Sequence, residues 1–189
     1  MSNTITNLPL AAGRWALDTN HSSVGFTIRH LGVSKVRGTF KRFDAELVVG
    51  ASLAESSLNA TIDVASLDTG NSDRDGHVLS PDIFDVASRP TMAFRSTSIV
   101  GDGTDWAVHG DLTIGAVTKP ITLDVEFGGI ETFPIGGPRH AGFEAKAEIR
   151  RKEFGIDMAL PPGIGVVALG DVVKVELDIQ LLEPESRTG

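Results

Sequence analysis

Apolar and polar residues alternate one by one along much of this chain. In the segment 173–181 (VKVELDIQL), every second residue from Val173 to Leu181 is aliphatic, and the residues between them are charged or carry an amide. A β-strand places successive side chains on opposite faces, so this segment would have one apolar face and one polar face. The alternation therefore predicts a strand that is buried on one side only.

The same period recurs in residues 22–30, 57–64, 105–115, 120–127 and 141–150, and shorter strand candidates lie at 14–18, 36–40, 44–49 and 91–99. With 21 glycines and 9 prolines between these segments, the pattern predicts an all-β, antiparallel fold. So many one-sided strands must bury their apolar faces in a sandwich or a closed barrel. The periodicity does not distinguish the two.

Composition excludes several functional classes. A net charge of −8 with scattered charges argues against a nucleic-acid partner, and the absence of cysteine excludes disulfides and thiolate metal sites. No apolar run is long enough to span a membrane, and the first 15 residues lack the features of a signal peptide, so we expect a cytoplasmic protein. A length of 189 residues fits a single domain.

Residues 71–82 (NSDRDGHVLSPD) have the oxygen-rich spacing of a calcium loop, with Asn71, Asp73, Asp75 and Asp82 as possible ligands. Two features oppose that interpretation: the last position is Asp rather than Glu, and a strand rather than a helix precedes the segment. We interpret it as a polar crossover loop with no metal. Ser80 and Pro81 then predict the start of a short helix in the following residues.

Several inward positions of the predicted strands are small: Ala45, Ala60, Gly110, Ala145 and Ala147. They would leave space inside the fold, unless larger side chains opposite them fill it.

Candidate polar site residues lie at strand ends. His30 has the inward parity of Phe26 and Ile28, so it would meet a ligand head group or be a core histidine bonded to backbone, whereas His21, placed on the same strand, would face outward. The run Arg150-Arg151-Lys152 would provide a cation for a charged head group, or form a solvated strand end.

Four segments carry a resemblance to a known family: residues 21–47 (HSSVGFTIRHLGVSKVRGTFKRFDAEL), 65–98, 110–127 (GDLTIGAVTKPITLDVEF) and 141–156 (AGFEAKAEIRRKEFGI). In order and spacing they resemble the YceI-like family of polyisoprenoid-binding proteins over about residues 14–182. The resemblance implies an extended, lipocalin-like antiparallel β-barrel with a short helix beside it, and a long apolar tunnel for an isoprenoid or similar chain. It implies neither catalytic activity nor a cofactor.

On this basis we expect a flexible segment 1–13, a single barrel domain 14–182 and a tail 183–189. Many family members carry an export signal, and its absence here again implies a cytoplasmic protein. The hairpin TIGAVTKP has Gly115 where the family often has Asn-Gly, and we expect Gly115 to supply the positive φ of the turn.

The favoured function is a non-enzymatic carrier or binding protein for a long-chain isoprenoid, quinone or other lipid, with a homodimer possible. The expected ligand-binding residues are Phe26, Ile28, His30, Phe40, Phe94, Leu112, Ile114, Leu123, Val125, Phe143, Ala147, Arg150, Phe154, Leu177 and Ile179. One alternative is an enzyme acting on an isoprenoid or fatty amide with His30, His77 or Asp75 as base. The other is a ligand-free stress-response scaffold.

Overall fold

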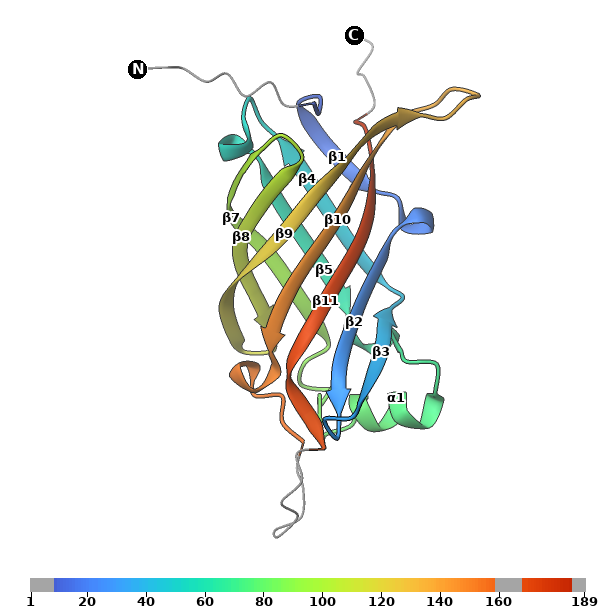
Figure 1. The fold of residues 1–189 in the computed structure, drawn as a ribbon, viewed down its shortest axis with the longest axis vertical. Helices are drawn as coiled ribbons and strands as arrows, with labels where there is room; N and C mark the ends of the chain where they lie inside the picture. Colours follow the sequence, from blue (N-terminus) through green and yellow to red (C-terminus); the bar gives the residue numbers. More distant parts are fainter. Residues whose placement is uncertain (1–8, 159–167, 185–189) are drawn as a thin grey trace.

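The computed structural model describes residues 9–158 and 168–184 (Figure 1). The strands are β1 (Gly13–Leu17), β2 (Ser23–His30), β3 (Ser34–Phe40), β4 (Phe43–Val49), β5 (Ser57–Asp63), β6 (Leu67–Asp68), β7 (Thr91–Asp102), β8 (Asp105–Ile114), β9 (Val117–Thr132), β10 (Arg139–Arg150) and β11 (Leu169–Leu182). The chain also forms an α-helix, α1 (Ser72–Leu79), and the 3₁₀ turns η1 (Thr19–His21), η2 (Leu53–Glu55), η3 (Val64–Ser66) and η4 (Arg151–Phe154).

The strands close into an antiparallel barrel. Within the described residues, eight strands form a ring in the order β1-β4-β5-β7-β8-β9-β10-β11, and β1 returns to pair with β11. The hairpin β2–β3, followed by β6, extends from residues Leu169 to Asp178 of β11. Closure leaves the ring without free edges, which long strands of this kind otherwise expose. The predicted lipocalin-like barrel is confirmed, and the sandwich is excluded.

The register confirms which face of each strand points inward. Phe143 on β10 stands opposite Phe127 on β9 and Ile179 on β11, so three apolar side chains share the interior. Its neighbour Glu144 stands opposite Glu126 and faces outward.

The helix position predicted from Ser80 and Pro81 was wrong. α1 lies one segment earlier, and Ser80 is its C-cap. The Asn71 side chain accepts a hydrogen bond from the Arg74 amide and so caps the N-terminus, while Asp73 in the first turn suits the positive end of the helix dipole. The residues considered as calcium ligands are therefore largely helical rather than a loop.

Gly115 adopts φ 59° in the β8–β9 hairpin, as expected. Gly103 has φ 60° in the β7–β8 hairpin, whereas Asp75-Gly76 lies inside α1. His21 and His30 also do not share a strand: η1 separates β1 from β2 and carries His21.

Aromatic side chains gather at the end of the barrel where the β7–β8 hairpin lies, which is the upper end in Figure 1. Trp106 stacks on Phe127 with ring centroids 5.4 Å apart, and Phe143 lies against both rings. Trp15 on β1 is fully buried, and its indole donates to the Ala11 carbonyl at 2.9 Å. This aromatic plug closes the end at which β1 starts and β11 finishes.

The chain on either side of the barrel strands is partly described. Of the segment 1–13 expected to be flexible, residues 1–8 lie outside the described residues, whereas Leu10 is buried in the core. At the other end, Glu183 pairs with Arg139, and hydrogen bonding to that guanidinium lowers the pKa of the Glu183 carboxyl.

Substituting Gly110 with alanine should lower the free energy of unfolding by about 1–3 kcal/mol, because the interior there is already full. A β-carbon on Gly110 would overlap the Phe94 ring and lie 2.5 Å from the Arg95 carbonyl oxygen. Gly76→Ala is the matched control: it meets nothing within 4 Å and should stabilise α1 by about 0.5–1 kcal/mol. Urea unfolding measures both, and equal effects of the two substitutions would contradict the packing described for Phe94.

Candidate functional site

The barrel encloses an apolar cavity of about 400 Å³. Its walls come from the inward faces of β2, β3, β4, β5, β7, β8, β9, β10 and β11, and α1 covers part of one end. Nearly all of the lining side chains are aliphatic or aromatic. A volume of this order lies within the range of small-molecule binding sites.

The structure places most of the predicted binding residues in one cavity wall. Those lining it are Phe26, Ile28, His30, Phe40, Phe94, Leu112, Ile114, Leu123, Val125, Phe143, Ala147, Leu177 and Ile179. Two lie elsewhere. Arg150 points outward, with its Nη1 3.3 Å from Asp171 Oδ2, and Phe154, the last residue of η4, is buried but does not line the cavity.

The lining is unevenly packed along the barrel. Near the aromatic plug, Ile99 and Trp106 are buried, whereas the inward side chains Phe26, Val175 and Leu177 on β2 and β11 remain partly exposed. Inward side chains on β5 and β9, such as Leu58 and Ile121, are partly exposed as well, whereas Ile28 on β2 is buried. Several strands therefore bound the unfilled space.

The small inward residues divide into two groups. Ala45, Ala60, Ala145 and Ala147 line the cavity and leave it open. The space at Gly110 is occupied by the Phe94 ring and that at Gly38 by the Phe26 ring, whose Cζ would lie 2.5 Å from an added β-carbon. The small inward residues thus leave space at some positions, and larger side chains fill that space at others.

Polar lining residues gather where α1 packs against the barrel, at the end opposite the aromatic plug (Figure 1). They include His30 at the end of β2, Thr69 before α1, Arg74 and His77 on α1, and Arg151 in η4. We call this end the mouth. The mouth is thus the more polar end of the cavity, and Ser56 is the polar lining residue near the start of β5 at the other end.

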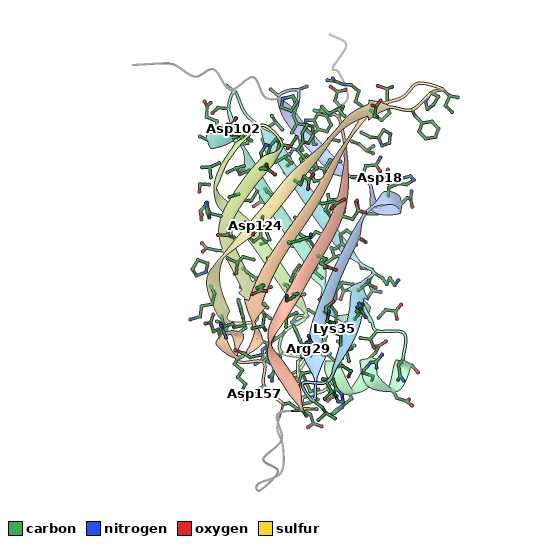
Figure 2. The ribbon with its side chains drawn as sticks, in the orientation of Figure 1. Asp18, Arg29, Lys35, Asp102, Asp124 and Asp157 are labelled. Atoms are coloured by element: carbon green, nitrogen blue, oxygen red, sulfur yellow. The ribbon has the colours of Figure 1, made fainter. Side chains whose placement is uncertain are left out.

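Arg151, rather than Arg150, is the cation turned into the barrel. Its side chain is 6% exposed, and it donates to the carbonyls of Gly170 (2.8 Å), Ile156 (2.8 Å) and Leu169 (2.9 Å) and to Asp157 Oδ1 (3.1 Å). Hydrogen bonding to Arg151 lowers the pKa of the Asp157 carboxyl, which lies at the mouth end in Figure 2. Arg151 therefore fastens the chain on both sides of residues 159–167 to the barrel.

Sequence reasoning missed Arg151 although its signal was present. On β10 the odd-numbered residues Ala145, Ala147 and Ile149 face inward, and Arg151 continues that parity into η4. The outward position of Arg150 follows from the same alternation.

Asp75 and His77, which were considered as catalytic bases, each contact another residue of the protein. Asp75 accepts hydrogen bonds from the Thr69 amide (3.0 Å) and hydroxyl (2.5 Å). His77 lies half exposed at the mouth of the cavity, with its Nε2 3.8 Å from Asp82 Oδ2. Among the residues that the structure describes, no group of three or more His, Asp or Glu side chains is arranged to hold a metal ion. In the same residues, no helix has the length and apolar character needed to cross a membrane.

A closed antiparallel barrel around an apolar cavity defines the lipocalin-like class of folds. The chain belongs to the YceI-like domain family, whose model matches residues 15–181. Protein YceI of Escherichia coli is 41% identical over 157 residues, which cover 82% of this chain and 81% of that protein. The resemblance seen in the motifs is thereby confirmed.

Solved structures show the same fold. The crystal structure of BcnA from Burkholderia cenocepacia has a TM-score of 0.73 at 25% identity, covering 87% of this chain and 98% of that one. A domain from Saccharophagus degradans, described as polyisoprenoid binding, has a TM-score of 0.65 at 15% identity and covers 90% of this chain and 98% of its own.

Replacing Arg151 with glutamine should lower the free energy of unfolding by about 2–5 kcal/mol, because buried carbonyls would lose their donor. The pKa of Asp157 should rise toward its ordinary value in the same variant. Lys152→Gln, an exposed neighbour in the same cationic run, should change stability by less than about 0.5 kcal/mol. Urea unfolding and a carboxyl titration by NMR measure these effects, and a stability loss shared equally by both variants would contradict the role given to Arg151.

Proposed function

We propose that this protein binds one long, weakly polar lipid chain, of the isoprenoid, quinone or related class, in the barrel cavity. The observation that carries the proposal is the set of inward apolar side chains on β2 and β11 that remain partly exposed inside a closed barrel. A folded protein normally fills such space, and a bound apolar chain would fill it here.

The shape of the cavity favours a long and slim ligand. β10 has 12 residues, which corresponds to about 40 Å of strand and to less along the axis of a tilted barrel. Each methylene removed from water contributes about 0.8 kcal/mol, so several isoprene units would bind without specific polar contacts. A sugar or nucleotide would instead leave its polar groups unpaired against this wall.

The distribution of polar residues supports one orientation of the ligand. The hydrocarbon tail would point toward the aromatic plug, and the head group would lie at the mouth near His30, Arg74 and His77. Arg151 makes hydrogen bonds to three carbonyls and one carboxylate, so its role is to hold the rim rather than to bind the head group.

We infer a role in binding or carrying rather than in catalysis. The hydrogen bonds that hold Asp75 to Thr69 support this inference, as does membership of the YceI-like family. The Saccharophagus domain described as polyisoprenoid binding supports it at the level of the fold alone.

Filling the cavity tests the proposal. Ala147→Trp should abolish uptake of a fluorescent prenyl probe, or weaken it at least tenfold, because the indole would occupy the space of the ligand. Stability should change little, since the new packing replaces the missing ligand. Lys146→Trp is the matched control, since it adds the same group to the outward face of the same strand.

Probe titration and thermal melts of both variants give the outcome. Equal probe affinity of Ala147→Trp and the unmodified protein would show that the cavity is not the binding site. The ligand-free scaffold would then be the better description.

A further inference from the structure

The hairpin that joins β2 to β3 at the mouth has an exposed apolar tip. Leu31 is 47% exposed and Val33 is 81% exposed, and both lie beside His30, which lines the cavity. The Leu31 amide donates to the Ala168 carbonyl at 2.9 Å, so the tip is held against the start of β11. These two side chains therefore project from the rim of the mouth into solvent.

The backbone conformation of this tip is unfavourable for leucine, the residue at position 31. The Val33 amide donates to the His30 carbonyl at 3.2 Å, and the residues between them, Leu31 and Gly32, have φ values of 52° and 71°. A positive φ at both positions favours Asn-Gly or Asp-Gly in a hairpin turn. Leucine there costs backbone energy and exposes apolar surface, so packing within the described part of the protein does not account for it.

Cations surround the tip without acidic partners. Arg29 stands directly opposite Lys35 across β2 and β3 (Figure 2). Arg37, two residues after Lys35 on β3, has the same outward parity. Like charges in this position repel each other. Within the described residues, none of the three forms an ion pair, although the chain carries a net charge of −8.

The acids of the protein are placed differently. At the mouth end, Asp75 is bonded to Thr69, Asp157 to Arg151 and Asp171 to Arg150. Asp73, Asp82 and Glu153 are exposed acids on other elements of this end. Farther from the mouth, acids stand opposite one another across neighbouring strands: Asp105, Glu126, Glu144 and Asp178. The β2–β3 hairpin is thus a locally basic part of the mouth end, while exposed acids lie on neighbouring elements and in an acidic belt around the barrel.

We propose that the β2–β3 hairpin docks the mouth of the barrel onto an anionic lipid bilayer. Leu31 and Val33 enter the headgroup layer, while Arg29, Lys35 and Arg37 lie against the lipid phosphates. The acidic belt is repelled by the same surface and orients the barrel with its mouth toward the membrane. The proposal of docking depends only on these residues. A role of docking in transferring a lipid to or from the cavity rests on the proposed function.

The area of the tip decides between a bilayer and a protein partner. A stable protein interface buries about 1,200–2,000 Å² in total, far more than two apolar side chains and three cations provide. Weak and reversible binding to a membrane needs only a small apolar insertion together with basic residues. A second copy of this chain is therefore disfavoured as the occupant.

Co-sedimentation of the full chain with vesicles tests the docking. Phosphatidylcholine vesicles containing about one third phosphatidylglycerol should bind the protein, and binding should weaken with added salt. The double variant Leu31→Asn with Val33→Ser should bind about tenfold more weakly. It should melt at the same or a higher temperature, because Asn tolerates a positive φ. Lys35→Gln should lower the affinity for these vesicles about fivefold.

The opposite end of the barrel supplies the control. The β9–β10 hairpin also exposes two apolar residues, Phe133 (58%) and Ile135 (90%), but it lies away from the mouth (Figure 1). Phe133→Ser with Ile135→Ser should leave vesicle binding unchanged. Absence of binding to anionic vesicles, or loss of binding only in this control, would overturn the proposal. So would a dimer in sedimentation velocity that only the Leu31 and Val33 variant abolishes.

Uptake of the prenyl probe from a membrane-free solution separates the two proposals. If the Leu31 and Val33 variant keeps probe uptake and loses vesicle binding, the hairpin acts in docking alone. If the unmodified protein binds vesicles but takes up no probe, docking stands and the proposed function fails.

Discussion

The pairing of β1 with the end of β11 makes this fold a barrel. Ala16 stands opposite Leu182 and Leu17 opposite Leu181, and this short ladder joins residues from the two ends of the domain. At the break between β1 and β2, the Asp18 amide donates to the Gln180 carbonyl at 2.8 Å, and the Gln180 amide donates to the Ser22 hydroxyl at 2.9 Å. β11 therefore keeps its hydrogen bonds across the break, and η1 is accommodated without opening the wall.

Because the barrel is closed, the sizes of the inward side chains determine where the cavity lies. Once the sheet is closed, every inward residue must share one interior, and large side chains pack closely at the β1 end. Toward α1, the inward alanines of β4, β5 and β10 are too small to do the same. The cavity thus arises from the distribution of residue sizes along the strands rather than from a separate binding element, and its more polar end follows from where the strands stop.

Much of this fold can be predicted from the sequence, because strand parity is a local property. The alternation identifies the strands and assigns Phe26, Leu123 and Leu177 to one interior, and all three line the cavity. The family resemblance decides between barrel and sandwich, which parity alone cannot. The helix is harder to place because Asn71 and Ser80 are both of residue types that favour a helix N-cap, and in the structure Asn71 is the N-cap while Ser80 is the C-cap. Charge alone favours Arg150 as readily as Arg151, and the parity of β10 must be continued into η4 to separate them.

The central claim is that the interior of the barrel holds one lipid chain. Native mass spectrometry of the protein purified from its own host tests it most directly, because it weighs the intact complex without a chosen probe. The account predicts one adduct per chain with the mass of a long-chain lipid, recovered on solvent extraction and absent when Ala147→Trp is purified in the same way. Only the mass of the bare polypeptide, with no lipid in the extract of the unmodified protein, would contradict it.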